Sequence, residues 1–138
     1  MATLEGGEAL KVLVIETDEG FRRQIAHRLR LDECTVIEVC EETAALGTLR
    51  KKDVDVVLLG LHGFRTTALA LLREIKQLRP TSEVILMNVS DELALSMEAM
   101  KLGAFDDLWA PIDMETLVAR VKEAHKRRKL REGRERSL

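Results

Sequence analysis

The chain lacks any apolar run long enough to cross a membrane, which takes about 20 residues. Its N-terminal segment, Met-Ala-Thr-Leu-Glu-Gly-Gly-Glu, also lacks the charged and apolar regions of a signal peptide. These absences argue against a membrane-spanning or exported protein. We therefore expect a cytoplasmic location.

Cysteine is scarce, and the two residues present are Cys34 and Cys40. Both fall on the same face of one predicted strand, roughly 20 Å apart at the usual rise per residue, which is too far for a disulfide between them. The sequence therefore predicts two reduced, half-buried thiols.

Aromatic residues are also rare, at 3% of the 138 residues, whereas 46% are hydrophobic and 33% charged. This composition suits one soluble domain with an apolar core. The net charge of −2 hides an asymmetry: residues 122–138 hold eight Lys and Arg against three Glu, and the rest of the chain has 14 basic and 21 acidic residues. The sequence predicts an acidic body and a basic C-terminal segment.

The basic segment contains Lys126, Arg127, Arg128, Lys129, Arg131, Arg134 and Arg136. Such cations can contact nucleic acid phosphates or an acidic partner, but no aromatic residue interleaves them and no recognition helix follows. Cations near a solvated helix C-terminus are the simpler interpretation. We expect neither nucleic acid binding nor a DNA-binding output domain in this chain.

Short apolar runs alternate with longer segments of helical period, which predicts five parallel strands joined by crossover helices. The runs at 12–15, 56–59 and 84–87 are continuously apolar, as expected of central strands covered on both faces. The runs at 34–39 and 105–109 include polar residues and are predicted at the two edges of the sheet.

Four of the helical segments carry an apolar stripe that we expect to pack on the sheet. The stripes are Phe21, Ile25 and Leu29; Leu69, Leu72 and Ile75; Leu93, Met97 and Met100; and Leu117, Val121 and Ala124. Ser90-Asp91 and Asp113 are predicted N-caps, Pro80 is predicted to end the third helix, and Gly103 to follow the fourth. A sheet of this kind places a site at the carboxyl ends of its strands.

Several segments, in this order and spacing, resemble the receiver domain of bacterial two-component response regulators over about residues 10–127. They include Lys11-Val-Leu-Val-Ile15, Asp55-Val-Val-Leu-Leu59, Glu98-Ala-Met-Lys-Leu-Gly-Ala104 and Pro111-Ile-Asp-Met-Glu115. The resemblance implies a single doubly wound α/β sheet of five parallel strands in the order 2-1-3-4-5, a flavodoxin-like fold. The predicted organisation is an N-terminal extension at 1–9, a receiver-like domain at 10–125 and a basic helical extension or tail at 126–138.

In such receivers an acidic pair and an acceptor aspartate hold Mg²⁺, while a hydroxyl residue and a lysine contact the phosphoryl group. Carried onto this chain, the acidic pair falls on Glu16 and Thr17, the acceptor on Gly60, the hydroxyl on Asn88 and the lysine on Ala110. Only Glu16 keeps the family's chemistry, and Gly60 has no side chain with which to form an acyl phosphate. The resemblance therefore implies a degenerate form, a pseudo-receiver.

In receivers, phosphorylation is coupled to the inward turn of an aromatic ring at a switch position. That position falls on Asp107 here, so there is no ring to turn. We expect no catalytic residue, cofactor or metal. Glu16 and Asp18 offer carboxylates for a weak divalent cation site, but carboxylates near a helix N-terminus are the favoured interpretation. His62 has no Cys or His partner at ligand spacing and is predicted to be an exposed loop histidine.

Without the phosphorylation chemistry, what remains of a receiver is its surface. Receivers use the face formed by the fourth helix, fifth strand and fifth helix to dimerise or to hold partners. Lys101, Asp106 and Arg120 fall where receivers carry cross-interface charges, although ordinary exposed charge explains them equally well. The hypothesis is a phosphorylation-independent interaction module of two-component signalling, not an enzyme, which binds a histidine kinase or another regulator or forms a homodimer.

A second hypothesis belongs to another class of protein. The smaller side chains around Gly60, Asn88 and Ala110 leave a vacated phosphorylation pocket that could admit a metabolite. On this interpretation the protein is a small-ligand sensor.

Overall fold

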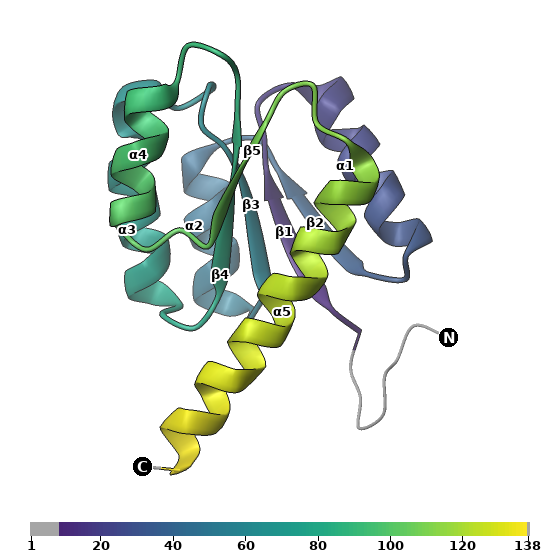
Figure 1. Cartoon of the computed structure of the whole chain (residues 1–138), viewed down its shortest axis with the longest axis vertical. Coiled ribbons are helices and arrows are strands. Elements are labelled where there is room, and N and C mark those ends of the chain that lie inside the picture. Colours follow the sequence, from purple (N-terminus) through teal and green to yellow (C-terminus); the bar gives the residue numbers. More distant parts are fainter. Residues whose placement is uncertain (1–8, 138) are drawn as a thin grey trace.

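A five-stranded parallel sheet forms the centre of the computed structural model, which describes residues 9–137 (Figure 1). Its strands are β1 (Lys11–Ile15), β2 (Thr35–Val39), β3 (Val56–Gly60), β4 (Glu83–Asn88) and β5 (Asp106–Trp109). They lie in the order β2-β1-β3-β4-β5, and every neighbouring pair is parallel. The predicted fold class, the strand order and the two edge strands are confirmed. Of the predicted N-terminal extension, residues 1–8 lie outside the described part.

The helices cover the sheet on both faces. They are α1 (Glu19–Leu31), α2 (Glu42–Lys51), α3 (Ala68–Leu78), α4 (Leu93–Lys101) and α5 (Met114–Ser137), with a short 3-10 turn, η1 (Arg65–Thr67), before α3. Buried residues of α2, α3 and α4 form one core with one face of the sheet, and those of α1 and α5 form a second core with the other face. Alternate residues of β1 divide between the cores, since Leu13 joins the first and Val14 the second.

The predicted stripe of α4 is wrong for two of its three residues. Leu93 and Met97 are 61% and 55% exposed, whereas Ser96 and Ala99 are buried. The helix turns this face inward because the Ser96 hydroxyl finds polar partners on β4 and β5. Met100 packs against the core as expected.

Helix boundaries follow the predicted signals with one exception. Asp113 caps α5 by accepting a 2.9 Å hydrogen bond from the Thr116 N–H. α3 ends at Leu78, shortly before Pro80, and Gly103 follows α4 with a φ of 104°, a left-handed conformation that favours glycine. The predicted Ser90-Asp91 cap is wrong, because the N-cap residue of α4 is Glu92.

α5 continues past the end of the sheet opposite the candidate site, so residues 126–137 extend the helix of the receiver-like domain (Figure 1). Arg128 is only 5% exposed and donates to Asp53 at 2.7 Å and to Asp55 at 2.8 Å. The solvated basic end predicted for this segment is therefore wrong at Arg128. Next to it, burial lowers the pKa of His125, and the charge of Asp55 opposes this shift only in part.

Both cysteines are free. Cys34 is partly buried, as predicted, and burial together with the charge of Asp32 raises the pKa of its thiol. Cys40 is exposed and follows β2, so the half-buried position predicted for it is wrong. Among residues 9–137, no helix has the length and apolar character needed to cross a bilayer.

Candidate functional site

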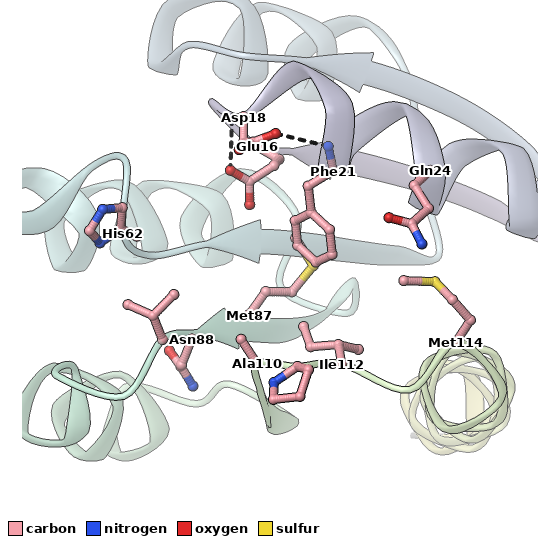
Figure 2. A pocket seen from close by; sticks show the side chains of 12 residues that line it. Glu16, Asp18, Phe21, Gln24, His62, Met87, Asn88, Ala110, Ile112 and Met114 are labelled. Carbon is pink, nitrogen blue, oxygen red and sulfur yellow. Dashed lines mark hydrogen bonds between the residues drawn. The ribbon is translucent and has the colours of Figure 1, made fainter.

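A cavity of about 400 Å³ opens at the carboxyl ends of the strands (Figure 2). Its apolar lining includes Phe21, Met87, Pro111, Ile112 and Met114. Polar groups come from Glu16, Asp18, Gln24, Asn88 and His62, and Ala110 completes the wall beside β5. The residues that follow β1, β3, β4 and β5 meet here because parallel strands end at the same edge of the sheet, and α1 and α5 add Phe21 and Met114. No lysine or arginine is among the described residues that line the cavity.

The Glu16 carboxylate lies directly over the Cα of Gly60. A Cβ placed on Gly60 would come within 2.9 Å of Glu16 Cδ and closer still to Oε1, a separation that real Cβ atoms essentially never show. The acidic group at the end of β1 thus occupies the space that a side chain at the end of β3 would enter.

Glu16 is 7% exposed, and its two carboxylate oxygens differ in their contacts. Oε2 accepts a 2.9 Å hydrogen bond from the Asp18 N–H and lies 3.5 Å from the Thr17 hydroxyl. The other oxygen points toward the cavity (Figure 2). Burial raises the pKa of the Glu16 carboxyl, and the charge of Asp18 adds to this, although the Asp18 N–H limits the rise. A buried carboxylate with one oxygen facing a cavity can receive a hydrogen-bond donor or a cation.

Asp18 and Thr17 have local structural roles. Asp18 is the N-cap of α1 and accepts a 2.9 Å hydrogen bond from the Phe21 N–H, which agrees with the helix N-terminus interpretation. The exposed Thr17 packs against the loop after β3, where a Cβ on Gly63 would lie 2.8 Å from Thr17 Cβ. The β1–α1 and β3–α3 loops therefore pack closely at this point.

A chain of hydrogen bonds links Asn88, Ser96, Asp107 and Trp109. The Asn88 amide donates to the Ser96 hydroxyl at 3.2 Å, and this hydroxyl donates to Asp107 Oδ2 at 3.0 Å. The Trp109 indole N–H donates to the same carboxylate oxygen at 3.2 Å. The residue at the predicted switch position thus connects the end of β4, the buried face of α4 and β5.

The predicted partner face is already paired within the chain at all three of its positions. Arg120 donates to Asp106 at 2.6 Å and also to Glu123 at 2.5 Å. Lys101 is exposed and lies 3.6 Å from Glu98 on the same helix. Asp106 and Arg120 therefore satisfy each other across β5 and α5 in the isolated chain.

His62 has acidic neighbours that sequence reasoning missed. Its side chain is 56% exposed, as predicted, but its Nδ1 lies 3.8 Å from Glu92 Oε2. With Asp91 these residues form a cluster whose ligand atoms all lie within 4.8 Å of one another. His62 and Glu92 stand 30 positions apart on different loops, so no spacing rule could have joined them.

Strand order, helix arrangement and the position of the cavity define the receiver class of doubly wound folds. A family model described as the response regulator receiver domain matches residues 12–122. The chain therefore belongs to the receiver domain family of response regulators, the proteins of two-component signalling.

Named relatives agree with this assignment. The chain is 30% identical over 117 residues to an NtrX-like response regulator of Rickettsia felis, a match covering 83% of this chain and 25% of that protein. It is 37% identical over 91 residues to the DNA-binding transcriptional regulator NtrC of Salmonella typhimurium, covering 66% of this chain and 19% of that protein. The matched part thus spans a quarter or less of these relatives' length.

Among solved structures, a CheY-like receiver domain protein from Methanospirillum hungatei superposes with a TM-score of 0.84. The two sequences are 16% identical, and the superposition covers 90% of this chain and 99% of that one. This similarity supports the fold alone.

The residues present do not fit the Mg²⁺ that the family implies. Magnesium needs several oxygen ligands in near-octahedral geometry. Gly60 offers no side-chain oxygen, Thr17 packs against Gly63, and Glu16 alone remains of the family's three metal-binding positions. The chain therefore lacks the ligand set of the family's magnesium site.

Proposed function

We propose that this receiver acts without aspartyl phosphorylation, as a non-catalytic protein-interaction module of a two-component pathway. The observation that carries the proposal is the Glu16 carboxylate lying over Gly60. An acyl phosphate needs a carboxylate at the acceptor position, and here that position lacks a side chain while a different carboxylate fills the space. A lysine that would offset phosphoryl charge is replaced by Ala110.

The hydrogen bonds around Asp107 support a single signalling conformation. In this chain the switch position holds a carboxylate with two donors, Ser96 and Trp109, instead of an aromatic ring. Turning Asp107 away would leave the half-buried Trp109 N–H and the buried Ser96 hydroxyl without this acceptor, which is costly. The surface that includes α4 is accordingly held in one arrangement.

The outer face of α4 provides a docking surface of suitable chemistry. Leu93 and Met97 lie one helical turn apart and are both more than half exposed. Two neighbouring large apolar side chains on a helix are typical of contacts with another protein. The partner is a histidine kinase, another regulator or a second copy of the chain. The second copy, docked through α4, β5 and α5, is the first to test.

The chemical part of the proposal is tested by intact mass after incubation with Mg²⁺ and acetyl phosphate. The control is a receiver that retains its acceptor aspartate, treated in parallel. We expect a phosphoryl adduct on the control and none on this protein. An adduct on this chain would mean that another residue accepts phosphate and would overturn the proposal.

The surface is tested by sedimentation of the wild type and of Leu93→Glu and Met97→Glu over a range of concentrations. Leu31→Glu is the matched control, because Leu31 is 67% exposed at the end of α1. We expect self-association that both α4 variants weaken and the control retains. Association that is insensitive to both α4 variants would refute this face as the interface, and a monomer at all concentrations would exclude the second copy as partner.

The cavity supports a second candidate, a small-ligand sensor. With Glu16 in the wall and no lysine or arginine among the lining residues, the cavity suits a small ammonium ion with an apolar body, and Phe21 adds an aromatic ring. A thermal-shift series of aliphatic amines against carboxylates of the same shape tests this candidate. Stabilisation by amines alone, lost in Glu16→Gln, would support it; equal effects of both series would reject it.

A further inference from the structure

Three side chains from two loops converge beside the cavity. His62 lies on the loop after β3 (Figure 2), and Asp91 and Glu92 lie between β4 and α4. One imidazole nitrogen and two carboxylate oxygens come within 4.8 Å of one another. These are the donor types that bind Zn²⁺ and related divalent transition metals.

Glu92 gives this cluster a feature that ordinary surface charges lack. Its side chain is 5% exposed, and Oε1 is fixed by a 2.9 Å hydrogen bond from the Val89 N–H. The other oxygen, Oε2, is buried and accepts no hydrogen bond from the described residues. It lies 3.8 Å from His62 Nδ1. A buried carboxylate oxygen without a donor is costly, and a bound cation would offset that cost.

Arg65 is the competing cation at this place. Its guanidinium lies 3.4 Å from His62 Nδ1 and 3.6 Å from Asp91 Oδ2. It therefore reaches the two exposed members of the cluster but donates no hydrogen bond to Glu92 Oε2. The Arg65 side chain is 61% exposed, so it can turn to solvent without loss of core packing.

We propose that His62, Asp91 and Glu92 form a binding site for a divalent transition-metal cation of the Zn²⁺ type. Ligands of Zn²⁺ lie about 2.0–2.2 Å from the metal, so neighbouring donor atoms need to be roughly 3.3 Å apart, close to the 3.8 Å between His62 and Glu92. Water completes the coordination on the exposed side. The Val89 N–H orients the Glu92 carboxylate by donating to Oε1, which leaves Oε2 for the metal.

The metal site goes beyond the proposed function, because a bound metal would act on the α4 surface that is proposed for docking. The metal would join the β3–α3 loop to Glu92, the N-cap residue of α4. It would thereby stabilise the position of α4, whose outer face carries Leu93 and Met97. Metal availability would then control docking in a receiver without an acceptor aspartate.

The experiment is a calorimetric titration of untagged protein with Zn²⁺, alongside Co²⁺ absorption spectra. Cys34 and Cys40 are replaced by serine in all samples, since free thiols bind the same metals. We expect one ion per chain. His62→Ala and Glu92→Gln should each weaken binding about tenfold or more, because the first removes a ligand and the second replaces a charged carboxylate with a neutral amide. His27→Ala is the control, because His27 is an exposed histidine on α1.

Arg65→Gln separates a built site from adventitious metal binding. Removing the competing guanidinium should tighten Zn²⁺ binding, whereas a non-specific surface site would not respond. The proposal fails if no ion binds, if His62→Ala binds as well as the wild type, or if Arg65→Gln leaves the affinity unchanged. The phosphodonor experiment is unaffected by any of these results, so failure of the metal site is distinguishable from failure of the proposed function.

Discussion

The carboxylate of Glu16, at the end of β1, fills the space that a side chain on Gly60, at the end of β3, would enter. In the receiver family these two positions hold a metal-binding acid and the acceptor aspartate. Here the side chain of Glu16 alone occupies the space of both. Restoring an aspartate at position 60 would therefore bring two carboxylates together unless Glu16 moved. The relationship makes the stability of this site depend on both residues jointly.

The first prediction concerns this coupling. Gly60→Ala should cost about 1–3 kcal/mol, because the added Cβ displaces the Glu16 carboxylate. In a Glu16→Ala background the same change should cost at least about 0.5 kcal/mol less. Urea unfolding of the four proteins measures the difference.

Gly47→Ala is the control for this cycle. A Cβ at Gly47 meets nothing within 4 Å on α2, so the substitution should stabilise the protein by up to about 1 kcal/mol through helix propensity. Equal costs of Gly60→Ala in both backgrounds would contradict the coupling.

The second prediction is a pH dependence. Burial raises the pKa of Glu16 in the folded state above its ordinary value of 4.5, so the native protein binds more protons than the unfolded chain in that window. The stability that Glu16 contributes is fully present below pH 4.5, and it is lost as the pH rises through the pKa of Glu16 in the folded protein. Glu16→Gln does not titrate, so its stability relative to the wild type should grow as pH rises through this window and level off above it.

Denaturant unfolding at a series of pH values checks this prediction. The comparison uses the difference between Glu16→Gln and wild type, which cancels the other titrating groups. A difference that stays constant from acid to neutral pH would show that the folded pKa of Glu16 is not raised.

The third prediction concerns the hydrogen bonds around Asp107. Ser96→Ala removes the acceptor for Asn88 and a donor to Asp107, which should cost about 1–3 kcal/mol because these groups are partly or fully buried. Trp109 fluorescence should also change, since its indole N–H shares the same carboxylate oxygen. Ser90→Ala, at an exposed position before α4, should stay within about 0.5 kcal/mol of the wild type. Unchanged stability and fluorescence in Ser96→Ala would reject the network.

The fourth prediction concerns Arg128. Arg128→Met should lower the free energy of unfolding by about 2–4 kcal/mol, because it leaves the Asp55 carboxylate without its guanidinium partner. The cost stays below that of a fully buried ion pair because the Asp53 side chain is 53% exposed. Arg134→Met, at an exposed position on the same helix, should have little effect. Thermal unfolding compares them. Equal stability of the two variants would indicate that the extension of α5 contributes nothing to the domain.

Most of the fold can be predicted from the local pattern of apolar and polar residues along the chain. The continuously apolar runs of β1, β3 and β4 indicated central strands, and the polar residues in β2 and β5 indicated edges. The positions of Glu16, Gly60, Asn88 and Ala110 at one edge of the sheet follow in turn, because parallel strands share the direction of their carboxyl ends.

The inward face of α4 could not be predicted in this way. Leu93 and Met97 have the spacing of a core stripe, yet the buried residue between them is Ser96. Burial of its hydroxyl is tolerated because Asn88 on β4 supplies a donor and Asp107 on β5 an acceptor. Apolar periodicity measures hydrophobic burial alone and contains no information about such partners.

The sequence by itself determined the parallel sheet, the position of the candidate site and the absence of a side chain at Gly60, since these depend on local periodicity and residue identity. Only the tertiary structure decided that Glu16 fills the space over Gly60, that Arg128 lies buried between Asp53 and Asp55, and that His62 meets Glu92. Each of these contacts joins segments far apart in the chain. Their geometry depends on how the packed helices and strands place separate loops. Local sequence patterns carry no information about that placement.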